Sequence, residues 1–373
     1  MNVDRDPIEV TPLQAEALHA AGVPLLDIRT PDERASGMPR GALAVAAAEL
    51  DAWLARMGAP QGVLLICASG RRSLRAAAGL RACGIAARSV AGGLAAWIAA
   101  ALPLSQTDLD VDARARYARQ LCLPEVGAAG QARLAQASVA LVGAGGLGAP
   151  TALYLAAAGV GRITLIDNDV IERSNLQRQV LYSDAEVGQR KVEAAARRLQ
   201  ALNPDIAVEA CVTRLDADNA VALLAGHDVL VDGADNFPAR YALSAASLQL
   251  RLPMVYGAVE RFAGQVSVFD PRRADSPCYR CLFPYPPAPG EVPSCVEVGV
   301  LGVVPGMAGL LQASEVLKLL LGIGKPLVGR LLLFDALDMR WRESTLPRDT
   351  QCPGCGPRPG PLSPDDVTRY CGA

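Results

Sequence analysis

Four cysteines arranged in two pairs carry the most specific chemistry in this sequence. Cys278 and Cys281 form one Cys-x2-Cys pair, and Cys352 and Cys355 form a second pair further along the chain. Two such pairs rarely arise by chance, and four thiolates from two separate loops suit a tetrahedral structural Zn²⁺ site. A redox-active pair is the alternative, although the dipeptides between the cysteines, Tyr-Arg and Pro-Gly, are typical of metal-binding knuckle turns. The spacing therefore predicts zinc bound by these four residues.

A different kind of cysteine lies in the segment Cys67-Ala-Ser-Gly-Arg-Arg-Ser73, between an apolar run that ends at Ile66 and a predicted helix that begins near Ser73. The backbone N–H groups of such a turn, the helix N-terminus and the side chains of Arg71 and Arg72 all favour negative charge at the sulfur. This environment suits a thiolate, or a persulfide that carries a transferable sulfur atom. An isolated cysteine at the end of a buried strand would instead be unreactive.

A glycine-rich turn, Gly143-Ala-Gly-Gly-Leu-Gly148, directly follows the apolar run Ser138–Val142 and precedes a predicted helix. Glycines at such a strand-to-helix turn let a phosphate approach the backbone at the helix N-terminus. Asp167 ends the next predicted strand, where its carboxylate is placed to accept hydrogen bonds from ribose hydroxyls. These features alone fit NAD as well as they fit ATP.

Charged residues downstream of this turn favour ATP. Arg178 and Lys191 follow the acidic strand end, and Asp235 and Asn236 follow a later predicted strand. An enzyme that attacks the α-phosphate of ATP needs fixed cations for the charge that builds on the phosphates, whereas a dehydrogenase needs none beyond its pyrophosphate turn. Asp235 would supply a carboxylate for Mg²⁺ at the carboxyl end of the sheet. Each of these residues could instead be a solvated surface group, so the preference for ATP depends on their occurring together.

Alternating strands and helices must position these residues. In residues 8–103, apolar runs at 23–27 and 62–66 predict buried parallel strands, and helical patterns follow at 49–57 and 73–83. The strands predicted further along are 138–142, 163–166, 228–231, 254–257 and 331–334, with helices at 150–158 and 189–202 between the early ones. This alternation predicts the α/β fold class, with a small parallel sheet that helices cover on both faces in the first unit.

Composition disfavours several classes of protein. The chain has 373 residues, of which 51% are hydrophobic and 4% aromatic, and this suits packed α/β layers rather than disorder. The net charge of −2 does not favour a nucleic-acid or anionic-membrane partner. The first residues lack the basic and apolar regions of a signal peptide, and polar residues interrupt the apolar stretch 299–321, which predicts a buried loop and helix rather than a membrane span. Ten cysteines without an export signal predict a cytoplasmic protein.

The first unit resembles the rhodanese-like sulfurtransferase family over nearly its full length. The matching stretches are 27–33, 37–42, the Cys67 turn and 90–97. The resemblance implies that Cys67 is the persulfide-carrying nucleophile and that Arg72 helps to orient its loop. Met38-Pro39 stands where the family often has His-Ile, at a place outside the sulfur cradle. The alternative is a loop that is kept only as a binding module.

Residues 113–356 resemble the E1-like activating enzymes of the ThiF/MoeB/HesA type, which adenylylate small ubiquitin-like proteins. The matching stretches are 116–120, 143–148, 166–169, 174–179, 187–191, 232–236 and both cysteine pairs. The resemblance implies a Rossmann-like ATP-binding domain with a mixed sheet. It implies that ATP is contacted by Gly146, Asp167, Ser174, Asn175, Leu176, Gln177, Arg178, Lys191, Asp235 and Asn236. It also implies that Arg119 reaches the ATP of the opposite subunit, which would make a homodimer the active form.

Cys295 is a candidate second catalytic thiol. It follows the proline-rich segment 286–290 and precedes the interrupted apolar stretch. In the E1-like family a loop at this place can carry a thiol that captures the activated carrier, although not all members use one. An external reductant is the alternative to Cys295.

Together these features predict a rhodanese-like domain at 1–103, a linker at 104–112, a ThiF/MoeB-like adenylyltransferase domain at 113–356 and a tail at 357–373. The predicted reaction is the adenylation, with ATP and Mg²⁺, of the C-terminal Gly-Gly carboxylate of a small ubiquitin-like sulfur-carrier protein. A Cys67 persulfide, charged by a donor such as a cysteine desulfurase, would then convert this carboxylate to a thiocarboxylate. The alternatives are adenylation with the first domain as a sensor or docking module, and an NAD-dependent oxidoreductase. Relatives more often carry the rhodanese-like unit at the C-terminus, so sulfur transfer within one subunit and between subunits both stay open.

Overall fold

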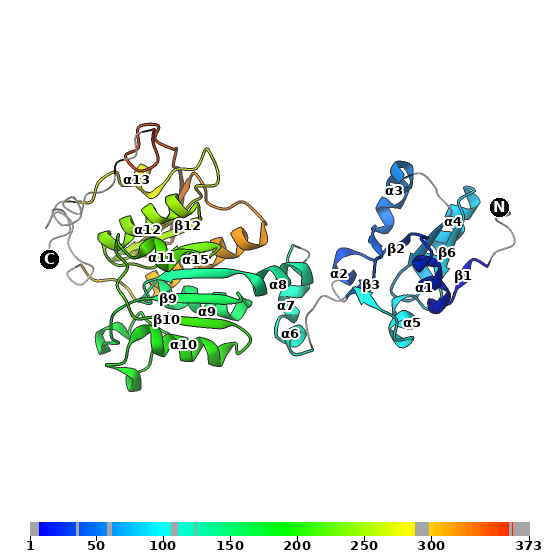
Figure 1. The fold of residues 1–373 in the computed structure, drawn as a ribbon, viewed down its shortest axis with the longest axis horizontal. Coiled ribbons are helices and arrows are strands. Elements are labelled where there is room, and N and C mark those ends of the chain that lie inside the picture. Colours follow the sequence, from blue (N-terminus) through cyan, green and yellow to red (C-terminus); the bar gives the residue numbers. More distant parts are fainter. Residues whose placement is uncertain are drawn as a thin grey trace. The chain divides into compact units, whose positions relative to one another are not determined.

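The computed structural model describes residues 7–34, 37–57, 62–105, 111–123, 125–287, 298–357 and 360. The chain divides into two compact units, Met1–Ala132 and Arg133–Ala373 (Figure 1). Each unit has its own sheet with helices around it, which confirms the predicted α/β fold class. The limits predicted for the domains, the linker and the tail stay predictions.

The first unit is built on a five-stranded parallel sheet with the strand order β1-β6-β5-β2-β4. Its strands are β1 (Glu9–Val10), β2 (Leu25–Asp27), β4 (Leu43–Ala44), β5 (Val63–Ile66) and β6 (Ala87–Val90), and a separate antiparallel pair is formed by β3 (Met38–Pro39) and β7 (Leu104–Ser105). Its helices are α1 (Pro12–Ala20), α2 (Pro31–Arg34), the 3-10 helix η1 (Ala47–Glu49), α3 (Leu50–Met57), α4 (Arg71–Ala82), α5 (Gly93–Ala99), α6 (Val111–Arg116) and α7 (Ala118–Leu121). The residues of β7 are those that begin the predicted linker.

Helices cover both faces of this sheet because its central strand, β5, is apolar on both sides. Ile66 packs with Trp97 in the cluster that α1 and α5 complete, whereas Leu65 packs with Leu80 in the cluster that α3 and α4 complete. Successive side chains of a strand point to opposite faces, so a continuous apolar run forms a strand that is buried on both sides. Cys67 follows directly at the carboxyl end of β5 and is 1% exposed.

The second unit is built on an eight-stranded sheet with the order β10-β9-β8-β11-β12-β13-β14-β15. The first five strands in this order are parallel and the last three are antiparallel, which confirms the predicted mixed sheet. The strands are β8 (Ser138–Val142), β9 (Arg162–Ile166), β10 (Ala207–Cys211), β11 (Val229–Asp232), β12 (Met254–Glu260), β13 (Ala263–Phe269), β14 (Arg330–Asp335) and β15 (Arg340–Thr345). The helices are α8 (Gly127–Gln136), which contains the division between the units, α9 (Gly148–Ala158), η2 (Arg173–Asn175), η3 (Asp184–Glu186), α10 (Lys191–Leu202), α11 (Ala220–Leu224), α12 (Phe237–Leu250), α13 (Tyr279–Leu282) and α15 (Val303–Leu321).

The strand order of this sheet reverses at one point and so creates a crevice. From β8 the chain passes through α9 to β9 on one side, whereas β11 pairs with β8 on the other side. Helices α9, α10 and α15 pack together against the sheet, and α12 packs with α11 against β11 and β12. In open α/β sheets, ligands bind outside the carboxyl ends of the strands at such a switch point. The turns that follow β8 and β11 therefore frame a binding site.

The apolar stretch that was predicted to form a buried loop and helix contains α15. Pro305 lies in its first turn, where the missing N–H costs no helical hydrogen bond. By length and composition alone, α15 is the one helix in the described part of the chain that would pass for a membrane span. It packs on β12, β13 and α9, and two of its polar side chains make hydrogen bonds inside the protein: Gln312 donates to the carbonyl of Asp232, and Glu315 accepts from the N–H of Leu327. This packing identifies α15 as a core helix of the second unit.

Candidate active sites

The turn after β5 surrounds the sulfur of Cys67 with hydrogen-bond donors. The backbone N–H and the hydroxyl of Ser73 each donate to Sγ at 3.4 Å. Gly70 has a φ of 85° and caps α4, so the chain turns sharply enough for the first residues of that helix to face the sulfur. Sequence reasoning predicted this arrangement, because the segment is short and each of its residues is local to the sulfur.

Burial and hydrogen bonding act in opposite directions on the Cys67 thiol. Burial tends to raise its pKa, but the hydroxyl of Ser73 and the backbone N–H groups of Ser73, Ser69 and Arg72 outweigh it, so the pKa of Cys67 lies below its usual value. A lower pKa means a larger thiolate fraction near neutral pH, and the thiolate is the nucleophilic form. The site is therefore able to hold a sulfur anion.

A glycine outside the turn, Gly93 at the start of α5, lets that helix lie directly against the Cys67 turn. A Cβ on Gly93 would lie 2.3 Å from the carbonyl oxygen of Cys67, so only glycine permits this close approach of α5. The first N–H groups of α5, those of Leu94 and Ala95, donate to the carbonyls of Cys67 and Ala68 at 2.8 and 3.2 Å. Because α5 binds these two carbonyl groups of the Cys67 turn, the N–H groups of the same turn are directed to the sulfur.

Arg72 makes an ion pair with Glu33 of the first unit. The hydrogen bond from the guanidinium lowers the pKa of Glu33 from 4.5 to about 2, and the same contact raises the pKa of Arg72. The Arg72 side chain thus ties the start of α4 to Glu33, while its backbone N–H faces Cys67. This position agrees with an orienting role for Arg72, and that role stays a prediction.

The second site is a cleft of about 1290 Å³ at the switch point between β8 and β11. The glycine turn forms its floor because the ends of the two strands come very close: a Cβ on Gly143 would lie 2.4 Å from the carbonyl oxygen of Gly233, and one on Gly148 would lie 1.9 Å from that of Gly143. Gly145 and Gly146 both line the cleft, at the start of α9. The predicted phosphate turn is therefore open to a ligand.

The acidic strand end and Lys191 form a linked set of charges on one wall of the cleft. Asp167 accepts from the N–H groups of Ala144 and Asp169 at 2.9 and 2.8 Å. Burial raises the pKa of Asp167, although Lys191 and these two hydrogen bonds act against it. The Lys191 side chain is 7% exposed and its ammonium donates to Asp169 at 2.8 Å. The ammonium of Lys191 thus pairs with Asp169, a residue that was not among the predicted site residues.

The structure brings six of the predicted ATP contacts to this cleft, namely Gly146, Asp167, Arg178, Lys191, Asp235 and Asn236. Asn236 also caps α12 by accepting from the N–H of Ala239 at 3.0 Å. The other predicted contacts of this segment, Ser174, Asn175, Leu176 and Gln177, do not line the cleft. Arg119 is exposed on α7 in the first unit, and Cys295 lies outside the described residues. The roles of all these residues stay predictions.

Two residues of the cleft, Gln179 and Arg240, were not predicted as site residues from the sequence. Gln179 is buried and its Oε1 has no hydrogen-bond partner among the described residues, so it is free to accept from a ligand. Arg240 braces the turn that carries Asp235: it pairs with the buried Asp232 at 3.4 Å and donates to the carbonyls of Ala234 and Gly257. A signal for Arg240 existed, because it stands one helical turn after the cap residue and so faces back toward that turn.

The four paired cysteines form one cluster, as predicted. Their Sγ atoms all lie within 4.8 Å of one another, and neighbouring pairs are 3.5, 3.6 and 3.9 Å apart. A tetrahedral zinc with sulfur at about 2.3 Å requires sulfur atoms about 3.8 Å apart, so the donor set and its spacing fit Zn²⁺. Backbone N–H groups of Cys278 and Gly354 donate to sulfur at 3.4 and 3.3 Å.

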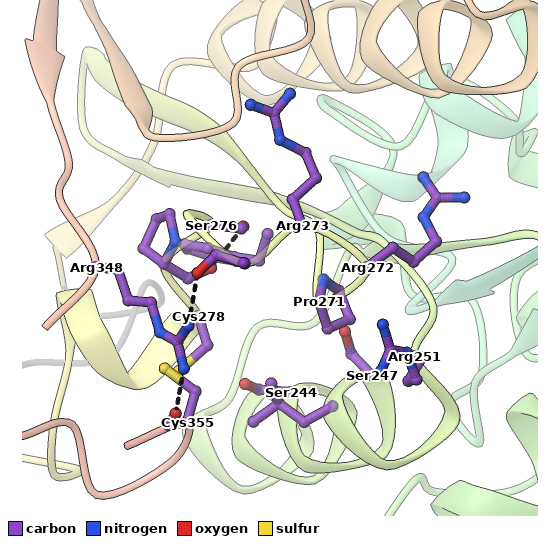
Figure 2. Close-up of a pocket in the computed structure, with 14 residues that line it drawn as sticks. Ser244, Ser247, Arg251, Pro271, Arg272, Arg273, Ser276, Cys278, Arg348 and Cys355 are labelled. Atoms are coloured by element: carbon purple, nitrogen blue, oxygen red, sulfur yellow. Dashed lines mark hydrogen bonds between the residues drawn. The ribbon is translucent and has the colours of Figure 1, made fainter. Parts of the chain in front are cut away.

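Arg348 holds the second cysteine pair, Cys352 and Cys355, in place (Figure 2). Arg348 donates to the carbonyls of Ala274 and Cys355 and so links the loop after β13 to the end of the knuckle. Arg272 and Arg273 also line the small hollow beside the cluster, but their guanidinium groups point away from it in Figure 2 and pair with Asp270 and Asp275. The surroundings of the cysteines are therefore built to fix loops rather than to admit a substrate.

Comparison with known proteins gives the same two parts. Residues 117–354 match the ThiF family and residues 11–100 match the rhodanese-like domain. The sulfur carrier protein adenylyltransferase of Thermus thermophilus is 52% identical over 260 residues, which are 69% of this chain and 96% of that protein. The adenylyltransferase and sulfurtransferase MOCS3 of Anopheles gambiae is 45% identical over 267 residues, which are 71% of this chain and 60% of that protein. The crystal structure of E. coli MccB with MccA-N7isoASN shares the fold, with a TM-score of 0.57 and 23% identity over 68% of this chain and 76% of that chain.

Proposed function

The chain belongs to the ThiF family and carries a rhodanese-like domain, and from this premise we propose that it activates a small sulfur-carrier protein and then transfers sulfur to it. The carrier is a ubiquitin-like protein whose C-terminus ends in Gly-Gly. The protein is an adenylyltransferase that also acts as a sulfurtransferase. The observation that carries the proposal is the cleft at the switch point, because it joins the open glycine turn to Arg178, Lys191 and Asp235.

The second unit performs the first step. A carboxylate oxygen of the carrier attacks the α-phosphorus of ATP, the bond to pyrophosphate breaks, and an acyl-adenylate forms. Charge builds on the α-phosphate and on the leaving pyrophosphate, and fixed cations stabilise it. Arg178 faces the glycine turn, and an ion pair with Asp169 holds the ammonium group of Lys191 at the wall of the cleft. We assign both side chains to the phosphates and Asp167 to the ribose.

Asp235 is the residue that we assign to Mg²⁺. Its carboxylate is exposed at the mouth of the cleft, beyond the end of β11, and its Oδ1 accepts only from the amide of Asn236 among the hydrogen bonds described for it. A magnesium ion keeps several waters and binds through one or two carboxylates together with substrate phosphates, so an exposed carboxylate at this position fits it. When bound, the ion would neutralise phosphate charge.

The first unit supplies the sulfur. The outer sulfur of a Cys67 persulfide attacks the acyl carbon, AMP leaves, and an acyl disulfide joins the carrier to Cys67. A second thiol then attacks the Cys67 sulfur, which releases the thiocarboxylate and leaves a disulfide for a reductant to open. The donors around Cys67 stabilise the persulfide anion before the attack. Cys295 or an external thiol is the second thiol, and a cysteine desulfurase is the class of enzyme that would charge Cys67.

The remaining parts of the proposal concern assembly. Zn²⁺ is held by Cys278, Cys281, Cys352 and Cys355 and has a structural role. The packed helices α9 and α15 expose the apolar side chains of Tyr154, Val303 and Leu310, which are 58%, 63% and 40% exposed, and this supports a homodimer in which Arg119 reaches the partner's ATP. Four zinc-binding thiolates and a reactive Cys67 thiol suit the reducing cytoplasm.

The proposal is tested by exchange of labelled pyrophosphate into ATP. We expect exchange when a carrier ending in Gly-Gly is present, and no exchange with the same carrier lacking its last glycine. With a sulfur donor added, the mass of the carrier should increase by the replacement of one oxygen by sulfur. If no such carrier supports exchange and the protein binds NAD more tightly than ATP, the proposal is wrong and an NAD-dependent activity takes its place.

A further inference from the structure

A buried hydroxyl lies directly behind the Cys67 turn, at a position that the sheet alone would fill with an apolar residue. Ser89 belongs to β6 and pairs with Leu65 of β5, so it points to the same face as the apolar cluster of α3 and α4. It is 0% exposed. Burial of a hydroxyl is unfavourable unless the group is hydrogen-bonded, and the two hydrogen bonds described for the Ser89 hydroxyl both lie in the Cys67 turn: Oγ of Ser73 at 2.8 Å and the carbonyl of Gly70 at 3.5 Å.

The Ser73 hydroxyl has one proton and several acceptors within reach. Sγ of Cys67 lies at 3.4 Å, the carbonyl of Gly70 at 3.0 Å and Oγ of Ser89 at 2.8 Å. If the Ser73 hydroxyl donated its proton to Ser89, it could not donate a hydrogen bond to the sulfur of Cys67. If Ser89 donates to Ser73 instead, the Ser73 proton is left for Cys67 or Gly70, and a sulfur anion is the stronger acceptor of the two.

We propose that Ser89 is a positioning residue that donates to Ser73 and thereby directs the Ser73 proton to the sulfur of Cys67, which stabilises the thiolate and the persulfide anion. Hydrogen bonds in a chain polarise one another in a buried site, so donation from Ser89 also makes Ser73 a better donor. The inference rests on the proposed role of Cys67 and adds a residue from a separate strand to its machinery. Ser89 acts through Ser73 and touches no reacting atom.

The test is the pH dependence of Cys67 alkylation by iodoacetamide in the full-length protein, followed by mass spectrometry of the Cys67 peptide. Ser89→Ala should move the midpoint of the profile to higher pH and lower the rate below the midpoint by about threefold, because part of one hydrogen bond to an anion is lost. The plateau rate at high pH should stay the same or rise, since a thiolate of higher pKa is intrinsically more nucleophilic. A general loss of packing would not produce this pair of changes.

A double-mutant cycle identifies the route through Ser73. Ser73→Ala should shift the midpoint further than Ser89→Ala, and the double variant should match Ser73→Ala alone, because Ser89 then has no donor to direct. An unchanged midpoint in Ser89→Ala, or a full Ser89 effect in the Ser73→Ala background, would overturn the proposal. If Ser89→Ala unfolds, Ser89→Cys keeps the side-chain size with a weaker donor and carries the same expectation.

This measurement needs neither a carrier nor a sulfur donor. A protein that shows the expected Ser89 effect but forms no thiocarboxylate would refute the proposed function and leave the inference about Ser89 intact. If the protein forms thiocarboxylate but the pH profile of Ser89→Ala is unchanged, the proposed function stands and the inference about Ser89 is refuted.

Discussion

The two anion-binding sites of this protein are prepared in different ways. At Cys67 the donors already point at the sulfur, and the hydroxyl and N–H of Ser73 are in contact with it. In the nucleotide cleft the charged groups contact one another: Lys191 pairs with Asp169, and Asp167 accepts from the glycine turn. At the first site the donors face the reactive atom itself, whereas at the second the proposed phosphate contacts would require Lys191 to part from Asp169.

The difference follows from what each site holds. The sulfur anion is covalently attached, so its charge must be stabilised all the time and the donors come from one short turn. A nucleotide comes and goes, so its site needs partners that stay satisfied in its absence, because an unpaired buried charge is costly. We therefore expect changes at Cys67 to remove a reaction outright, and changes in the cleft to reduce a rate.

The largest effect is expected for Cys67→Ala. Without the sulfur atom no persulfide forms, so transfer from thiosulfate or a persulfide donor should be abolished, while carrier-dependent pyrophosphate exchange continues because it needs no thiol. Mass spectrometry of the carrier after a single turnover measures the product. Cys83→Ala, which removes an exposed thiol of the same unit, is the control and should behave as the parent. A Cys67→Ala protein that still makes thiocarboxylate would contradict the sulfur relay.

The next effect is expected in the cleft. Arg178→Ala should slow pyrophosphate exchange by about 10²–10³-fold, equivalent to about 2.7–4 kcal/mol of transition-state stabilisation, because one charge-assisted contact to the phosphates is lost. Sulfur transfer from thiosulfate to a small thiol should be unaffected. Arg173→Ala is the matched control, since Arg173 lies in the same segment but pairs with Asp184 away from the cleft. Equal exchange rates in the two variants would show that Arg178 has another role.

Loss of the metal site should act on stability rather than on chemistry. Metal analysis should find about one zinc per chain, and Cys352→Ser should lower the free energy of unfolding of the second unit by more than about 3 kcal/mol, or roughly 6–12 °C in Tm. The cluster joins α13 to the last described loop, so its loss frees both. Cys122→Ser, at an exposed thiol outside the cluster, should leave the Tm unchanged. A zinc-free protein of normal stability would rule the site out.

The sequence was sufficient for features that are local or carried by several motifs. The Cys67 turn, the glycine turn after β8 and the two cysteine pairs each consist of adjacent residues, so their geometry follows from strand and helix ends. The strand β10 was missed because it is an edge strand with largely exposed side chains and no apolar run. β13 and β15 were also missed.

Contacts between distant segments could not be read in advance. The pair of Lys191 with Asp169 and the hydroxyl pair of Ser73 with Ser89 depend on how separate strands and turns come together. The close approach of Gly93 to Cys67 has the same origin. Residue type and spacing therefore predicted which chemistry each site serves, whereas the groups that hold the reactive side chains in place required the structure.

The smallest effect is expected for loss of the ion pair between Arg72 and Glu33. This change tests the orientation of the Cys67 turn without removing the reactive sulfur. The pKa of Glu33 is lowered from 4.5 in the unfolded chain to about 2 in the folded protein, so the pair stabilises the fold above pH 4.5 and its contribution is lost as the pH falls toward 2. Because both side chains are partly exposed, Glu33→Gln should cost less than about 1 kcal/mol at pH 7.

Denaturant unfolding at pH 7, 5, 4 and 3 measures this contribution, and the gap between the parent and Glu33→Gln should shrink at the lowest values. Asp51→Asn, at an exposed carboxylate on α3, is the matched control for removal of one negative charge from the same unit. If Arg72 also orients the Cys67 turn, Glu33→Gln should slow sulfur transfer slightly at every pH, because the guanidinium loses its anchor while the backbone N–H groups stay near the sulfur. A stability gap that stays constant down to pH 3 would show that the carboxylate charge of Glu33 contributes nothing to the stability of the fold.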